Sequence, residues 1–237
     1  MKILKIGLAA ISLTAATQSC EILNQLPNIE TNLPLTEAEV SSGLKEALKV
    51  GIRNAVVETS AENGYYGNAL IKIPFPEEAG RVKTTLTDIG MGSLIQNFEE
   101  SMNHAAEQAS AQATDIFVDA ITQMTIQDAM GILHGNDDAA TAYLRRTTET
   151  RLNNAFRPII DNALQQGNVT QYWNQITTRY NQIPFVNKVN TDLTGYVTEA
   201  AMDGLFIMVA KEEQQIRENP QARINDILKR VFGSLDS

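Results

Sequence analysis

The sequence predicts an all-α fold, a single irregular helical bundle of about eight helices with one short extended segment. Apolar residues recur at helical spacing after a capping box formed by Thr36 and Glu39. Glycines such as Gly167 stand where these patterns end. Only residues 69–73 alternate like a strand, and Pro74 follows at once. We therefore expect an extended segment that crosses the bundle without a partner strand.

The same start and stop signals give the first and last residue of each predicted helix. The whole chain divides into three parts. We expect a signal peptide over 1–19, a lipidated tether over 20–35 and an all-helical domain over 36–237. The predicted helices are 37–61, 76–88, 93–124, 125–134, 137–166, 170–182, 192–218 and 222–232.

The N-terminal residues are typical of a secretory signal. Two early lysines precede an apolar stretch over 6–16, which is too short to span a bilayer. The single cysteine, Cys20, follows where such a signal is cut. We interpret the chain as a lipoprotein exported to the bacterial cell envelope, on the periplasm side or at the outer membrane, with acyl chains on Cys20. The alternative is ordinary cleavage that leaves Cys20 as a free thiol.

The charge balance argues against polyanionic partners. The chain has 19 Lys and Arg against 28 Asp and Glu, for a formal net charge of −9. Nucleic-acid binders gather basic residues on one face, which this sequence does not do. We expect no nucleic-acid partner, and membrane attachment only through the acyl chains on Cys20. Pro27 and Pro34 interrupt any helix in the tether.

Most catalytic and cofactor motifs are missing. One cysteine and two histidines exclude cysteine-based zinc and iron–sulfur sites and nearly exclude a multi-histidine centre. Gly90 and Gly92 lack the third glycine of a dinucleotide site, and no phosphate loop or nucleophile elbow occurs. We expect no cofactor, no metal and no catalytic residue that a motif would identify.

One helix face carries Glu100, His104 and Glu107 at spacings of i, i+4 and i+7. Helical di-iron sites place carboxylates and histidines in this way but need two Glu-x-x-His pairs, and the chain lacks the second. We interpret this face as solvated and the histidine as an ordinary one.

Several charged residues are candidates for a polar cleft. Glu213 and Arg217 have the i, i+4 spacing of an ordinary pair on an exposed helix, but crowded charge can also line a cleft. Arg145 could bind an anionic group. The candidate cluster consists of Glu107, Arg145, Asp203, Glu213, Arg217 and Arg223.

Residues 200–210 are apolar on every side of a helix except at Asp203, so we expect the buried central helix of the bundle. A buried carboxylate needs a partner, and we expect either an arginine or lysine from another helix or several backbone or hydroxyl donors within hydrogen-bonding distance of Asp203. Gly204 should let another helix approach closely. On this interpretation, loss of the Asp203 carboxylate would cost about 3 to 5 kcal/mol.

Five stretches carry a family resemblance, and in their order along the chain they are LTEAEVSSGLKEALKVG, IKIPFPEE, MNHAAEQA, DAMGILHGNDDAATAYLRRTT and DGLFIMVAKEEQQIRENPQARINDILKRVFG. The chain resembles the bacterial domain-of-unknown-function family 4197 from about Leu35 to Gly233. The resemblance implies a helical, exported protein, often a lipoprotein, without an assigned activity. It supplies no catalytic residues.

Three functions are compatible with these observations. The first is a non-enzymatic, lipid-anchored envelope protein whose bundle binds a partner protein or an apolar or amphipathic ligand. The second is an envelope hydrolase or other enzyme that uses a carboxylate and arginine cleft, and the third is a structural or assembly role. A fold alone does not choose between them. An apolar pocket with few polar groups favours the first function, whereas carboxylates with shifted pKa values within hydrogen-bond reach favour the second.

Overall fold

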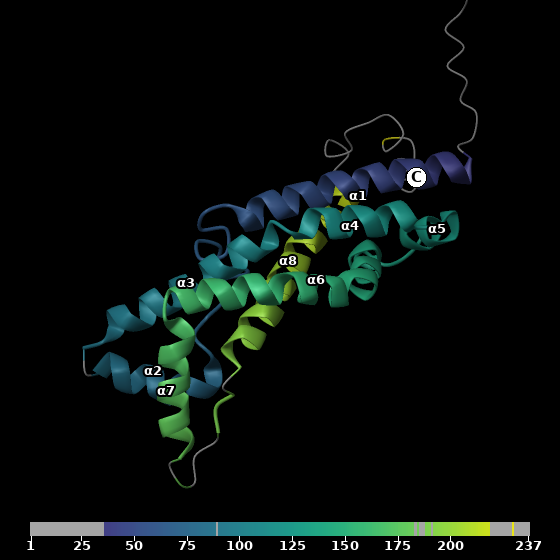
Figure 1. Ribbon diagram of the computed structural model, residues 1–237. Coiled ribbons are helices and arrows are strands. Elements are labelled where there is room, and N and C mark those ends of the chain that lie inside the picture. Colours follow the sequence, from purple (N-terminus) through teal and green to yellow (C-terminus); the bar gives the residue numbers. More distant parts are fainter. Residues whose placement is uncertain are drawn as a thin grey trace, which may run out of the picture. The chain divides into compact units, whose positions relative to one another are not determined.

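The computed structural model describes residues 36–88, 90–182, 184, 188–190, 192–218 and 229. All regular structure in this part of the chain is helical and none of it is a strand, which confirms the predicted all-α bundle (Figure 1). The eight α-helices are α1 (Glu37–Ser60), α2 (Gly80–Asp88), α3 (Gly92–Ser110), α4 (Ala113–Gln123), α5 (Ile126–Leu133), α6 (Ala139–Gln166), α7 (Val169–Asn181) and α8 (Leu193–Glu218). A 3-10 turn, Glu77–Ala79, precedes α2. The helix predicted over 222–232 lies outside the described residues.

Local capping chemistry fixes where α1 and α5 begin. The Thr36 hydroxyl accepts the Glu39 N–H at 3.2 Å, and the Glu39 carboxylate accepts the Thr36 N–H at 2.9 Å. Thr125 and Asp128 repeat this reciprocal arrangement at the start of α5. These bonds satisfy backbone donors that lack a partner within the helix, so the predicted helix starts are confirmed.

The single helix predicted over 93–124 is wrong, because the chain turns after Ser110 and continues as α4. The Gln112 N–H donates to the Ala109 carbonyl at 3.0 Å, which is the i→i+3 bond of a tighter turn. Neither glycine nor proline stands at the break. The cause is tertiary packing, since α4 contacts α1 and α6 whereas α3 also contacts α8. Ala109 and Ala113, which flank the turn, are fully buried, and their small side chains permit this close packing.

Helix α8 lies at the centre and packs on α1, α3 and α6, as predicted (Figure 1). It is the one described helix that is long and apolar enough to cross a membrane, but 61% of its most apolar window is buried in the bundle. Burial inside the protein accounts for its apolar composition. The predicted burial of Asp203 is wrong: its side chain is 62% exposed. Asp203 and Ile207, four residues apart, lie on the strip of α8 that faces solvent.

The connection between α1 and the 3-10 turn alternates as predicted but pairs with no strand in the described structure. Ile71, Ile73 and Phe75 are buried, and the residues between them are partly or fully exposed. At Gly204, a Cβ atom would lie 2.7 Å from the Tyr65 ring. Gly204 thus admits this irregular segment, not another helix as the sequence predicted.

Candidate functional site

Glu107 holds the turn that follows α1. Its side chain is 6% exposed, and one carboxylate oxygen accepts the backbone N–H groups of Tyr65 at 3.0 Å and Tyr66 at 3.2 Å. The other oxygen lies 2.6 Å from Nδ1 of His104, and this hydrogen bond raises the pKa of the imidazole. The sequence suggested that this helix face is solvated, but the Glu107 side chain on it is buried. Among the described residues, no group of three His, Cys, Asp or Glu side chains could hold a metal ion.

Glu213 and Arg217 form a buried pair, not the exposed one that their spacing suggested. Arg217 donates to Glu213 at 2.8 Å, and their side chains are 14% and 4% exposed, respectively. The Glu213 carboxylate also accepts the N–H groups of Ala140 and Thr141 at the start of α6, at 3.0 and 2.8 Å. Arg217 reaches the Ile132 carbonyl near the end of α5 at 2.9 Å. This pair therefore joins three helices, which is a structural role.

Asp203 does meet an arginine from another helix, because Arg145 of α6 donates to it at 2.7 Å. The guanidinium also lies 4.4 Å from the centre of the Phe206 ring. Both residues line an open polar groove between α6 and α8 with Glu149, Thr150, Asn153, Asn154, Glu199 and Met202.

The candidate polar residues do not share one site among the described residues. Asp203 and Glu213 are ten residues apart on α8, which separates them by about 15 Å along the helix axis. Glu107 contacts a different turn, and Arg223 lies outside the described residues.

We predict that Asp203→Ala lowers the free energy of unfolding by no more than about 1 kcal/mol. An ion pair this exposed is screened by water and salt, so it contributes little. Urea unfolding of the two proteins measures the difference. A loss above about 2 kcal/mol would mean that the pair acts as a buried one and would contradict the observed exposure.

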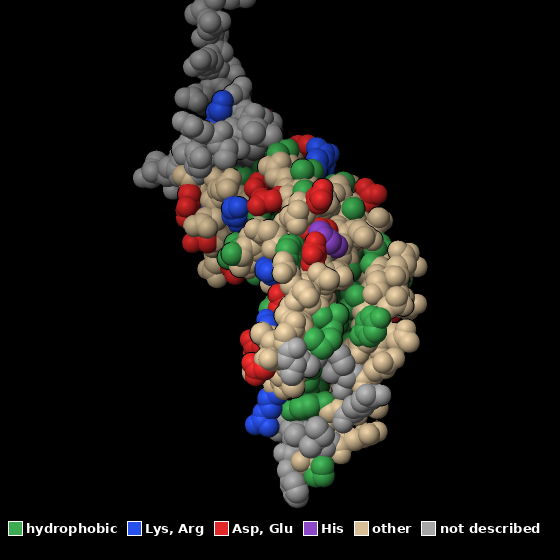
Figure 2. All heavy atoms as spheres, turned by 90° about the vertical axis from the view of Figure 1, so that its left-hand side faces the viewer, with side chains coloured by type: hydrophobic (Ala, Val, Ile, Leu, Met, Phe, Trp, Pro, Cys, Tyr) green, Lys and Arg blue, Asp and Glu red, His purple; other side chains and the backbone are tan. Residues whose placement is uncertain are grey.

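An apolar hollow, here named the aromatic pocket, lies elsewhere in the bundle, where the first half of α3 meets the start of α7. Its volume is about 200 Å³. Figure 2 views the side of the bundle that is on the left in Figure 1, and hydrophobic side chains reach the surface in the lower half of that face. The residues that line the pocket are Phe75, Leu94, Ile95, Asn97, Phe98, Ser101, Gly167, Val169, Tyr172 and Trp173.

Three aromatic rings from different elements form one wall of this pocket. The centroids of Phe75 and Trp173 lie 5.7 Å apart with the rings nearly perpendicular, and Phe98 is 5.6 Å from Trp173. Such edge and tilted contacts are favourable arrangements for aromatic rings. No charged side chain lines the pocket, whose polar side chains include those of Asn97, Ser101 and Tyr172.

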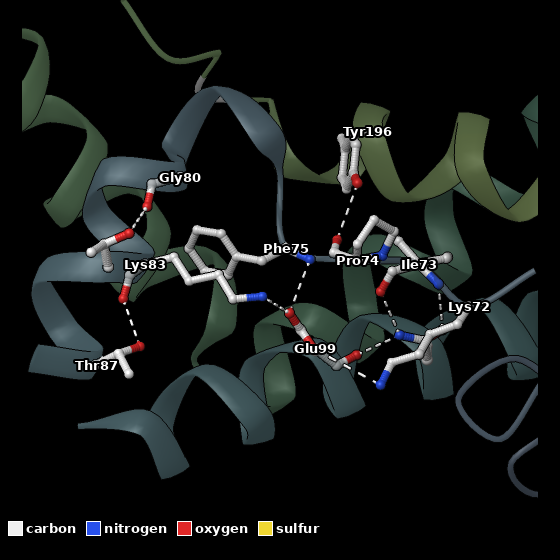
Figure 3. A network of polar contacts seen from close by, with 11 residues as sticks. Lys72, Ile73, Pro74, Phe75, Gly80, Lys83, Thr87, Glu99 and Tyr196 are labelled. Atoms are coloured by element: carbon white, nitrogen blue, oxygen red, sulfur yellow. Dashed lines mark hydrogen bonds and ion pairs between the residues drawn. The ribbon is translucent and has the colours of Figure 1, made fainter. Parts of the chain in front are cut away.

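A polar network holds the segment that carries Phe75 (Figure 3). The Asn103 side chain accepts the Ile73 N–H and donates to the Ile73 carbonyl, both at 2.8 Å. This amide thereby takes the place of a neighbouring strand.

The residues on either side of Ile73 are held as well. Glu99 accepts the Phe75 N–H at 3.2 Å and pairs with Lys83 at 2.7 Å, while the Tyr196 hydroxyl donates to the Pro74 carbonyl (Figure 3). The position of the Phe75 ring is thus set by α3 and α8.

Sequence reasoning missed the aromatic pocket. Its lining comes from three stretches that are far apart in the chain, and their apolar residues have the same spacing as core residues. The available signals were the single tryptophan and the IKIPFPEE stretch that contains Phe75.

Comparison with known proteins agrees with the resemblance seen in the sequence. No curated protein and no solved structure matches the chain. Residues 34–233 match the model of the family described as protein of unknown function, DUF4197. This match covers most of the chain, and the protein therefore belongs to the DUF4197 family.

Proposed function

We propose that this protein is a non-enzymatic, lipid-anchored protein of the bacterial cell envelope that binds an uncharged apolar or amphipathic molecule. The observation that carries the proposal is the aromatic pocket, which is concave, apolar and free of charged lining residues. Binding sites for small molecules commonly combine an apolar lining with a few polar groups.

The size of the pocket limits the ligand. An apolar cavity of about 150 Å³ is enough to bind benzene. A hollow of about 200 Å³ therefore takes one ring or one short alkyl chain. The two chains of a whole phospholipid would not fit.

The distribution of exposed apolar residues favours a small ligand over a partner protein. A stable protein interface buries about 800 Å² on each partner. The large exposed hydrophobic residues of the described structure are spread over several elements, and only Leu94 and Tyr172 among them line the pocket. A protein partner would need a broader apolar face than these two side chains provide.

Titration with toluene and phenol tests this proposal. Trp173 is the only tryptophan of the chain and lines the pocket, so a bound ring should change its fluorescence. We expect the heat measured by calorimetry to saturate as ligand is added. The Trp173 emission, excited at long wavelength, should change over the same range of ligand concentration. The absence of both signals up to the solubility limit of toluene would contradict the proposal.

Two matched variants locate the binding. Leu94→Glu puts a carboxylate at the pocket lip in the first turn of α3, where an acidic residue does not disfavour the helix. Ile126→Glu makes the same change at another exposed apolar residue in a helix first turn, outside the pocket lining. Only Leu94→Glu should weaken binding, whereas equal weakening by both would place the ligand elsewhere.

Membrane anchorage rests on the sequence, because residues 1–35 lie outside the described part of the chain. If Cys20 is acylated, the wild-type protein should stay with membranes through a high-salt wash, and Cys20→Ser should become soluble or stay unprocessed. Burial of acyl chains contributes about 0.8 kcal/mol per methylene and is not screened by salt. Fractionation and mass spectrometry measure both outcomes. Wild-type protein with unmodified Cys20 in the soluble periplasmic fraction would contradict the anchor.

A further inference from the structure

The carboxylate of Glu107 is buried against the turn over 61–68 that follows α1. Its side chain is 6% exposed, and one of its oxygens accepts the backbone N–H groups of Tyr65 and Tyr66. A buried carboxylate is unfavourable unless donors and a positive charge compensate it. Among the described residues, the one cationic partner of Glu107 is His104, whose Nδ1 atom lies 2.6 Å away. This positive charge exists only while the imidazole is protonated.

The same turn packs on α8 through Tyr65. This side chain is fully buried, and its hydroxyl donates to the Ala201 carbonyl at 2.6 Å. Its ring lies where a Cβ atom at Gly204 would stand. Burial raises the pKa of the phenol well above its usual range, so Tyr65 keeps its proton through weakly alkaline pH. Whatever holds the backbone of the turn therefore also holds this contact with α8.

Few charged groups surround the imidazole of His104. On α3, Glu100 lies 3.5 Å from Nε2 and Glu107 contacts Nδ1. In the segment after α1, the centre of the Tyr66 ring is 6.4 Å from that of the imidazole, and Lys72 lies over the Tyr66 ring. In the described structure, the helices packed against α3, namely α1, α2, α6 and α8, form no ion pair with His104 or Glu107. The hydrogen bond to Glu107 and the nearby Glu100 raise the pKa of His104.

We propose that His104 is a pH switch for the turn over 61–68. Its protonated ring compensates the buried charge of Glu107 and keeps the turn closed on α8, and loss of one proton to solvent loosens the turn. Because a carboxylate only accepts hydrogen bonds, Nδ1 donates to Glu107 in both states, and the proton that leaves is the one on Nε2. The hydrogen bond to Glu107 then persists as a weaker one with a neutral donor.

The direction of the pH dependence follows from the linkage between proton binding and closure of the turn. The closed turn raises the pKa of His104, so it binds the proton more tightly than the open turn does. The stabilisation is complete below about pH 6.5, the usual pKa of a histidine, and is lost as the pH rises through the raised pKa. We therefore expect a closed turn at mildly acidic pH and a looser one at weakly alkaline pH.

Hydrogen exchange of backbone amides tests this inference. The Tyr65 and Tyr66 amides donate to Glu107, whereas the Ile73 amide donates to the Asn103 side chain, which does not titrate. The ratio of the tyrosine exchange rates to the Ile73 rate cancels the general acceleration of exchange by hydroxide. This ratio should rise about fivefold between about pH 6 and pH 9, the difference expected between a hydrogen bond to a charged group and a neutral one.

The imidazole signals of the unaltered protein show whether His104 is the group responsible. The chain has two histidines, so the spectrum of His134→Gln assigns both titrations. We expect the midpoint of the exchange ratio to coincide with the titration of His104 and to lie above the usual range of histidine. A ratio that does not change with pH, or a midpoint that differs from the His104 titration, would overturn the inference.

Two variants remove the switch in opposite directions. His104→Gln keeps an amide donor without a charge, so the exchange ratio should be high at every pH. His104→Lys keeps a positive charge over the whole range, so the ratio should be low at every pH. His134→Gln is the matched control and should keep the pH dependence of the wild type. A pH-dependent ratio in both His104 variants, or its loss in His134→Gln, would overturn the inference. If a His104 variant does not fold, the match of the two midpoints in the unaltered protein decides.

Discussion

Replacing Glu213 with alanine should lower the free energy of unfolding by about 3 to 5 kcal/mol, the cost of breaking a buried ion pair by removing one partner. The variant removes the carboxylate that pairs with the Arg217 guanidinium, whose side chain is only 14% exposed. It also leaves the N–H groups of Ala140 and Thr141 without their acceptor. Urea unfolding followed by circular dichroism at constant pH measures the loss.

The large effect follows from the position of Glu213 at the start of α6. The N-cap residue of that helix, Asp138, makes no side-chain capping bond, so the first-turn donors depend on a carboxylate from α8. A negative charge there is also favoured by the helix dipole. Glu213 therefore stabilises the junction of α6 with α8 and, through Arg217, the end of α5.

Two variants serve as controls for this prediction. Glu213→Gln keeps an acceptor oxygen but removes the charge, so its loss should be smaller than that of Glu213→Ala. Asp203→Ala removes a carboxylate from the same helix at an exposed position and should cost no more than about 1 kcal/mol. If Glu213→Ala lowers the free energy of unfolding no more than Asp203→Ala does, the buried contacts of Glu213 do not stabilise the protein as the structure indicates.

These two acidic residues also mark a limit of sequence reasoning. The sequence led us to expect Asp203 buried and Glu213 exposed, and the structure shows the reverse. An i, i+4 pair has the same spacing whether it faces solvent or a neighbouring helix. Similarly, an apolar window predicts that a helix is central but not which strip of it stays exposed.

Local signals predicted most helix boundaries to within a few residues. The capping boxes at Thr36 and Thr125 satisfy their own backbone donors and need no distant residue. The turn after Ser110 has no such signal, because alanine and glutamine favour helix and the turn arises from packing on α1, α6 and α8. Prediction succeeded where the cause is local and failed where the cause is another part of the fold.

The aromatic pocket was beyond prediction for the same reason. Phe75, Phe98 and Trp173 meet only because the irregular segment is held on α3 and α7 packs beside it. In sequence they are single aromatic residues in ordinary apolar patterns. A concave site made from three separate segments appears only after the chain has folded.

Replacing Asn103 with alanine should lower the free energy of unfolding by about 2 to 4 kcal/mol. The side chain is fully buried and satisfies both the N–H and the carbonyl of Ile73. Each buried backbone group left without a partner costs about 1 to 3 kcal/mol. No strand in the described structure stands ready to replace the lost amide. Urea unfolding measures the loss, and hydrogen exchange at the Ile73 amide should quicken at the same time.

Gln108→Ala is the matched control, because it removes an exposed amide from the same helix and should change stability by no more than about 0.5 kcal/mol. The Asn103 variant has a second consequence, since Phe75 lies two residues beyond the released Ile73 and lines the aromatic pocket. A looser Phe75 ring should weaken ring binding in protein that is still folded, and Gln108→Ala should not. A stability loss below about 1 kcal/mol with unchanged exchange at Ile73 would show that the segment does not depend on Asn103, and the positioning of the pocket wall by α3 would then be wrong.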